Sequence, residues 1–184
     1  MQELLDKWNI KIDYKVLLSM WNEPHRHYHS QNHLIDLIEQ VNESKSFLNS
    51  QKDYEKLIIC SLFHDCIYDT SNSDNEQKSA DFFLSCCQEK NQDIKHIYQM
   101  ILDTKEHKSD DTLSKMFNHF DMNIVERDFE QLLEWESGIK SEYEPVFGIE
   151  RYKDGRLKFL ESLLDKYPNN TENLLNLIEW VKNN

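Results

Sequence analysis

The stretch LIICSLFHDCIYDT, from Leu57 to Thr70, decides the fold and raises the first chemical question. Between Leu57 and Phe63 it is apolar nearly all round, as expected of a helix buried on every side at the centre of a bundle. His64 and Asp65 follow at the C-terminal end of this helix. Because an unpaired charge is costly to bury, the carboxylate of Asp65 needs a compensating partner, and an adjacent His and Asp suit a metal ion.

Helical spacing continues on the N-terminal side of this segment. Asp13 begins DYKVLLSMW as an N-cap residue, and apolar positions follow at the intervals of a helix. After the break at NEP, the sequence HRHYHSQNHLIDLIEQV predicts a helix that begins near His29 or Ser30, because its apolar residues form one stripe. We therefore expect His29 and His33 to lie one turn apart on one face.

Further helices are predicted downstream. NEQKSADFFLSCCQEK follows a polar loop as an amphipathic helix, and DIKHIYQMILDTKEH continues as another that carries Asp103 and His107 four residues apart near its end. Residues 111–148 predict two or three more helices, and residues 151–167 and 171–184 predict the last two.

Composition supports the same fold class. The chain has 184 residues, of which 39% are hydrophobic and 30% charged, and this is typical of a globular domain with a substantial core. Only three glycines and three prolines are available for hairpins and tight turns, and no segment alternates as a half-buried strand does. We therefore predict an all-α chain that folds as a single domain over residues 1–184, an irregular helical bundle.

The charge of the chain excludes one class of partner. The sequence has 34 acidic and 21 basic residues, whereas binding to a nucleic acid duplex depends on Lys and Arg that neutralise phosphates. The N-terminal segment has no signal-peptide core, and no run approaches the roughly 20 apolar residues of a membrane span, so we expect a cytoplasmic protein without membrane contact. The cysteines lack the spacing of a disulfide framework, and we expect reduced thiols at Cys60, Cys66, Cys86 and Cys87.

The ligand candidates occur in a recognisable order. A His in RHYHSQNHL comes first, then His64 with Asp65, and then an Asp near position 121. This H…HD…D order resembles the HD-domain superfamily of metal-dependent phosphohydrolases, an all-helical group. Within residues 24–165, successive segments also resemble the motifs of one subfamily of predicted metal-dependent phosphohydrolases: RHYHSQNHL, FHDCIYD, NEQKSA, ILDTKEH, DMNIV and IKSEY with a later GR.

The resemblance implies a site for a divalent metal ion, with His33, His64, Asp65 and Asp121 as ligands. Mn, Mg, Fe, Co, Ni and Zn are all compatible with imidazole and carboxylate donors. Spacing alone leaves His29 and His33 as alternatives for the first ligand. We favour His33, because the ligand in related HD proteins lies a few residues inside its helix, and His29 then supports the site or contacts substrate.

The last ligand also has an alternative. The family's D-x-D-L motif appears here as HFDM, with His119 at the first acidic position. His119 and Asp121 point roughly 200° apart on a regular helix, so only one of them faces the ion. We favour Asp121, because a carboxylate balances the charge of a divalent ion better than another neutral imidazole.

Other residues near the motifs are candidates for chemistry and substrate binding. Carboxylates beside a metal-activated water suit general acid or base catalysis, and those candidates are Asp65, Asp69 and Glu76, although Glu76 equally suits a helix cap. Candidates to bind the phosphate are Arg26, His29, Lys78 and His107. For Arg26 and Lys78 the alternative is a plain surface cation, and for His107 it is an imidazole at a helix C-terminus. Lys140, Glu142, Tyr143, Arg151 and Arg156 are expected to form a salt-bridged support for the site rather than to act as catalysts.

These features predict a metal-dependent phosphohydrolase. Its expected partner is a small phosphorylated substrate, a nucleotide by superfamily precedent, attacked by a metal-activated water. The alternative is a non-catalytic metal-binding or nucleotide-sensing HD module, which the loss of the first acidic residue in HFDM allows. A helical interaction domain without metal is the third hypothesis. The sequence carries no indication of oligomeric state.

Overall fold

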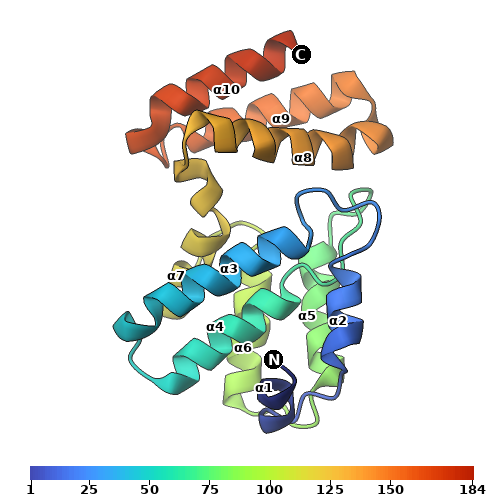
Figure 1. The fold of residues 1–184 in the computed structure, drawn as a ribbon, viewed down its shortest axis with the longest axis vertical. Helices are drawn as coiled ribbons and strands as arrows, with labels where there is room; N and C mark the ends of the chain where they lie inside the picture. Colours follow the sequence, from blue (N-terminus) through green and yellow to red (C-terminus); the bar gives the residue numbers. More distant parts are fainter. The chain divides into compact units, whose positions relative to one another are not determined.

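The structure, a computed structural model, describes residues 1–184, and every regular element in it is a helix (Figure 1). The predicted all-α fold class is confirmed, since the only β pairing is an isolated bridge between Ile10 and Cys87. The chain divides into two compact units, Met1–Asp121 and Met122–Asn184. The single domain expected over residues 1–184 stays a prediction.

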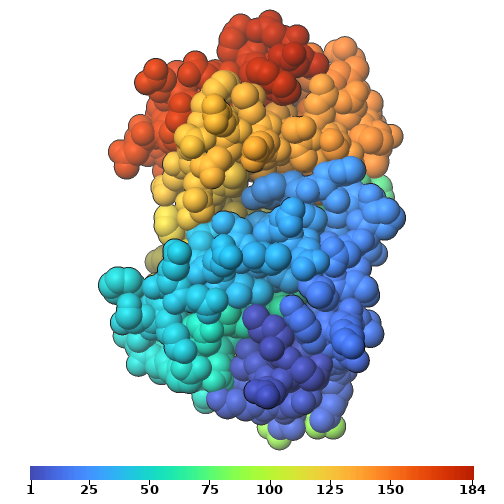
Figure 2. Space-filling model, viewed as in Figure 1, coloured from blue at the N-terminus to red at the C-terminus, as the bar shows by residue number.

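The first unit packs its helices around one of them. Its elements are α1 (Gln2–Lys7), α2 (Tyr14–Met20), α3 (Gln31–Ser44), η1 (Lys45–Phe47), α4 (Gln51–Phe63), α5 (Asn75–Cys86), α6 (Gln92–Asp103) and α7 (Thr112–Asp121). Helix α4 packs against α3, α5, α6 and α7. In the space-filling view, α1, α2 and α3 form one face of this unit in shades of blue (Figure 2).

Helix α4 is the predicted central helix. Ser50 caps its N-terminus by accepting a hydrogen bond from the backbone N–H of Asp53. Every residue from Leu57 to Phe63 is at most 2% exposed, so the helix has no solvent-facing side over this length. Because it ends inside the bundle, the residues that follow Phe63 lie among the other helices of the unit.

Two helix boundaries differ from the predictions. Helix α3 begins at Gln31 with Ser30 as its N-cap, so His29 precedes the helix, and the expected one-turn relation of His29 to His33 is wrong. Helix α6 ends at Asp103, and the hydroxyl of Thr104 donates to the carbonyl of Ile101 at the last turn. The predicted extension of this helix to His107 is therefore wrong. The Asp13 cap of α2 is confirmed.

The second unit is a bundle of three long helices. Its elements are η2 (Asn123–Glu126), α8 (Phe129–Phe147), α9 (Ile149–Leu163), η3 (Pro168–Asn170) and α10 (Thr171–Asn183), and α8, α9 and α10 pack against one another (Figure 1). Gly148 joins α8 to α9 with a φ of 77°, a conformation that glycine adopts at little cost. Inside this bundle Glu136 is fully buried and accepts hydrogen bonds from the Tyr152 hydroxyl and, at 2.6 Å, from Arg156 Nε.

The state of the cysteines and the apolar character of the helices complete the description of the fold. All four cysteines are free, and Cys60, Cys66 and Cys87 are buried while Cys86 is partly exposed. None of the helices combines the length and apolar character that crossing a membrane requires.

Candidate metal centre

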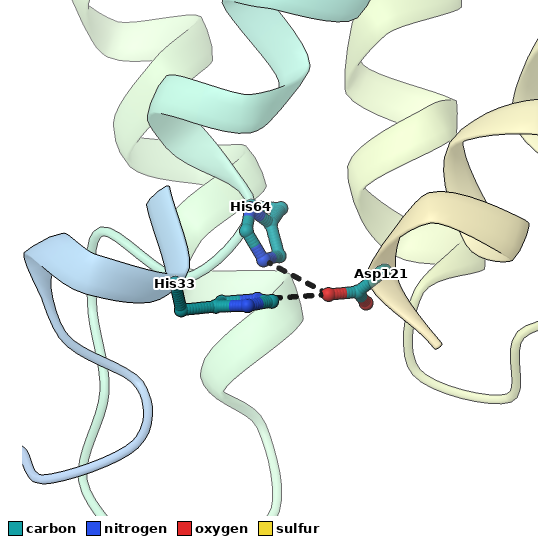
Figure 3. Close-up of side chains that lie close together, drawn as sticks. All are labelled: His33, His64 and Asp121. Atoms are coloured by element: carbon teal, nitrogen blue, oxygen red, sulfur yellow. Dashed lines mark hydrogen bonds and ion pairs between the residues drawn. The ribbon is translucent and has the colours of Figure 1, made fainter. Parts of the chain in front are cut away.

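Three helices of the first unit bring two imidazoles and a carboxylate together. His33 comes from the first turn of α3, His64 follows the last residue of α4, and Asp121 ends α7. Their side chains point toward one another (Figure 3). One donor atom from each residue lies within 4.8 Å of the others. The sequence predicted all three as ligands.

Local sequence explains how each of these elements reaches the site. Leu34 and Leu37 form the buried stripe of α3, which fixes the rotation of the helix and turns His33 inward with an exposed fraction of 7%. Gln40 lies on the same helix and donates to the carbonyl of Phe120, the residue before Asp121. The end of α7 is thereby tied to α3 beside the candidate ligands.

The donor atoms are closely spaced. Asp121 Oδ1 lies 3.0 Å from His33 Nε2 and 3.5 Å from His64 Nε2. Asp65, in the turn after α4, places Oδ2 3.4 Å from His64 Nε2. Asp65, the fourth predicted ligand, is not part of this group of three and contacts it at His64.

The hydrogen bonding of His64 defines which nitrogen is available to a ligand. Its Nδ1 lies 3.2 Å from the carbonyl oxygen of Ser61, which only accepts, so Nδ1 carries the proton. When the ring is neutral, Nε2 therefore carries no proton and its lone pair can bind a ligand. This nitrogen is sealed from solvent and has no hydrogen-bond partner, and the 3.5 Å to Asp121 is an ion-pair distance rather than a good hydrogen bond.

The carboxylates around His64 shift the ionisation of the whole group. Burial lowers the pKa of His64, but the charges of Asp65 and Asp121 outweigh burial and raise the pKa from 6.5 to about 9. Burial likewise raises the pKa of Asp121, but the charge of His64 and the hydrogen bonds from His107 and His33 hold it well below its usual range. The raised pKa of His64 and the lowered pKa of Asp121 both correspond to a site that favours a positive charge on His64 beside a negative charge on Asp121.

This arrangement fits a divalent metal ion. With its raised pKa, His64 holds a proton at Nε2 between two carboxylates, and a divalent ion can take the place of that proton. Donor atoms around an ion with bonds of about 2.1 Å are separated by roughly 3.0–3.4 Å in octahedral or tetrahedral shells, close to the separations found here. A mixed set of imidazole and carboxylate donors suits Zn, Mn, Fe, Co and Ni, and the carboxylates also suit Mg.

His107 holds the other oxygen of Asp121. Its Nε2 lies 3.0 Å from Asp121 Oδ2, so the two oxygens of this carboxylate face different imidazoles. The backbone of His107 has a φ of 49°, in the left-handed region that residues with a side chain rarely adopt unless their surroundings hold them there. The sequence suggested that His107 binds a substrate phosphate, and the structure places its ring against Asp121.

Arg26 lies beneath the site rather than on its surface. Its side chain has no exposed area, and its Nη1 donates to the carbonyls of Asp65 and His29 while Nη2 donates to that of Cys66. Its Nε donates to Glu23. Because every guanidinium nitrogen is occupied, the predicted contact of Arg26 with substrate has no support in this geometry.

The remaining candidates lie around the loop that follows the His-Asp pair. Asp69 is exposed and accepts from Ser71 and Asn72, bonds that lower its pKa. Oε2 of Glu76 is buried without a hydrogen-bond partner, 3.9 Å from Lys105 Nζ. Lys78 pairs with Asp74 one turn away on the partly exposed side of α5.

The alternative ligands His29 and His119 lie in different surroundings from the preferred ligands His33 and Asp121. His29 stacks on the ring of Tyr68, with centroids 4.2 Å apart, while His33 enters the group with His64 and Asp121. His119 is exposed, whereas Asp121 contacts the imidazoles. The preferences for His33 and Asp121 agree with this arrangement.

Two aromatic residues beside the site were not among the sequence-based candidates. Rings of Trp21 and Phe117 each lie 5.3 Å from the ring of His64, and Trp21 Nε1 donates to the carbonyl of Leu62. Trp21 is the last residue of the helical segment predicted from Asp13, and an indole at a helix end beside a loop was the available signal. These rings exclude water from His64 and strengthen the electrostatic interactions there.

No protein-family model, curated protein or solved structure matches the chain.

Proposed function

We propose that the chain is an HD-type metal-dependent phosphohydrolase that acts on a small phosphate ester, with a nucleotide as the substrate class. The motif order H…HD…D supports this proposal, as does the meeting of His33, His64 and Asp121 in one group. The observation that carries it is the buried Nε2 of His64, which faces two carboxylates and has no hydrogen-bond partner.

His33, His64 and Asp121 are the residues that would hold the ion, with Asp65 as a further ligand. A divalent ion supplies a Lewis acid for a phosphoryl oxygen and lowers the pKa of water toward neutrality. The charges of Asp65 and Asp121 balance those of a divalent ion, so an anionic phosphate is not repelled from the loaded site. His107 keeps Asp121 oriented by holding its second oxygen.

Glu76 is the remaining carboxylate that we consider for general acid or base catalysis. The oxygens of Asp69 are occupied by Ser71 and Asn72, and its lowered pKa keeps it ionised, so it is a poor proton donor. Glu76 retains a buried oxygen that accepts no hydrogen bond.

The test is a turnover panel. Protein stripped of metal and reloaded with Mn, Mg, Co, Ni or Zn is assayed on phosphomonoesters, phosphodiesters and pyrophosphates. We expect hydrolysis of at least one class with at least one ion, lost on Asp121→Asn and retained on His119→Ala. Absence of turnover across the panel with confirmed metal loading would count against catalysis.

A non-catalytic metal-binding or nucleotide-sensing module is the second candidate. His119 stands at the first acidic position of the family's D-x-D-L motif, so the chain keeps only one of the two carboxylates of that motif. Calorimetry separates the two candidates, because a sensor binds a nucleotide in a metal-dependent way and releases it unchanged.

A further inference from the structure

Side chains bond to the backbone carbonyls at the C-terminal end of α4 and in the turn that follows it. The last carbonyls of a helix lack partners within the helix, and here they and the carbonyls of the following turn bond to side chains. His64 Nδ1 is bonded to Ser61, Trp21 Nε1 donates to Leu62, and Arg26 donates to Asp65 and Cys66. Arg26 thus brings a buried positive charge to the negative end of the helix dipole.

Arg26 also joins two segments that carry candidate ligands. Its Nη1 lies 2.8 Å from the carbonyl oxygen of Asp65 and 3.0 Å from that of His29, the loop residue just before the N-terminus of α3. The rings of Trp21 and Tyr68 lie 5.5 and 5.4 Å from the guanidinium carbon, so the side chain is fixed from both sides. The carbonyl that Arg26 holds belongs to the same residue as a candidate ligand carboxylate.

We propose that Arg26 is a positioning residue that sets metal affinity by fixing the backbone of Asp65 relative to the entry of α3. The inference rests on the metal centre of the proposed function. A rotation of the Asp65 peptide moves its carboxylate, and a metal site tolerates displacements of only about 0.5 Å. Lysine cannot replace Arg26, because a single ammonium lacks the planar fork whose nitrogens here point at several acceptors.

An electrostatic role and a positioning role of Arg26 predict opposite changes in metal affinity. A buried cation beside the site repels a metal ion, so an electrostatic role alone predicts that Arg26→Met raises metal affinity and that Arg26→Lys leaves it unchanged. A positioning role predicts that both substitutions lower affinity. Residues that support metal ligands typically contribute roughly 10- to 100-fold to affinity, and we expect a loss in this range for both variants.

The second unit supplies a matched control. Arg156 is also a buried arginine, with an exposed fraction of 7%, an ion pair to Glu136 and aromatic rings against its guanidinium. Arg156→Lys should reduce stability without changing metal affinity.

The experiment is a titration of metal-free protein with Co²⁺, followed by the visible absorption of the bound ion, which reports its coordination geometry. Arg26→Lys and Arg26→Met should both bind Co²⁺ more weakly with an altered spectrum, while Arg156→Lys keeps the affinity and spectrum of the wild type. The readout is metal binding, so a protein that binds Co²⁺ but hydrolyses nothing contradicts the proposed function and still tests this inference.

Chemical rescue addresses variants that fold poorly. Millimolar methylguanidinium should restore Co²⁺ affinity to Arg26→Ala and leave Arg156→Ala unchanged. Wild-type affinity in Arg26→Lys, a gain in Arg26→Met, absent rescue, or equal spectral changes in the Arg156 variants would each overturn the proposal. Failure of the wild type to bind Co²⁺ would overturn both this inference and the metal centre.

Discussion

Glu136, a fully buried carboxylate of the second unit, and Asp121, a largely buried carboxylate of the first, are satisfied in different ways. Glu136 in the second unit accepts from a phenol and a guanidinium, donors that keep their protons at neutral pH. Asp121 in the first unit faces the nitrogens of His33, His64 and His107, which donate only when they carry a proton. Both oxygens of Glu136 are satisfied without a ligand, while a proton or a metal ion must complete the surroundings of Asp121.

Replacing Asp121 should have the largest effect of the substitutions considered, because it should abolish most of the metal binding. Asp121→Asn replaces the carboxylate that faces all three imidazoles, and we expect metal affinity to fall by more than the roughly 100-fold that marks loss of a supporting residue. Elemental analysis of purified protein and titration with Co²⁺ measure the loss. His119→Ala is the matched control, because that side chain is exposed on the same helix. Equal metal content in the two variants would mean that Asp121 is not a ligand.

Disrupting the cluster of Glu136, Tyr152 and Arg156 in the second unit should lower stability and leave metal binding intact. Glu136→Gln removes the charge opposite Arg156, and leaving one partner of a buried ion pair uncompensated costs about 3–5 kcal/mol. Urea unfolding of the metal-free and metal-loaded proteins measures this cost. Loss of metal from the folded variant would show that the cluster in the second unit contributes to the site.

The two clusters should also respond to pH in different ranges. The pKa of His64 is raised from 6.5 to about 9, so the folded protein holds this proton more tightly than the unfolded chain does. The resulting stability is complete below pH 6.5 and is lost as pH rises toward 9, a change on the order of 3 kcal/mol in metal-free protein. Burial and Glu136 raise the pKa of Tyr152 above its usual value of 10, so that cluster titrates only in more alkaline solution.

Urea unfolding of the chelated protein across this pH range tests the prediction. Metal loading should remove the decline, because the ion replaces the proton at His64 and metal affinity rises with pH. A free energy of unfolding that stays constant from pH 6.5 to 9 in metal-free protein would contradict the assigned environment of His64.

The fold class and the residues of the candidate metal centre were predictable because local patterns encode them. The apolar run from Leu57 to Phe63 specifies a helix without a solvent-facing side, and His64 and Asp65 then lie at its end. The scarcity of Gly and Pro indicated helices throughout. The order of motifs suggested His33 and Asp121, although the sequence left His29 and His119 as alternatives.

The roles of the supporting residues were not predictable because they depend on contacts distant in sequence. Arg26 was expected to contact substrate, yet its guanidinium bonds to carbonyls 39 and 40 residues away. His107 was expected within a helix, and its position against Asp121 depends on the end of α6 at Asp103 and on a left-handed backbone conformation. Helical spacing carries no information about either arrangement.

The smallest effect should come from His107, whose contribution is to orient a ligand. His107→Ala leaves His33, His64 and Asp121 in place but frees Asp121 Oδ2, which now bonds to His107 Nε2 at 3.0 Å. Loss of such a partner lowers metal affinity by roughly 10- to 100-fold, less than loss of Asp121 itself. His107→Gly separates the backbone from the side chain, because glycine adopts a φ of 49° without strain. Co²⁺ titration should show equal losses for both variants, and higher affinity in His107→Gly would assign part of the effect to backbone conformation rather than to the imidazole.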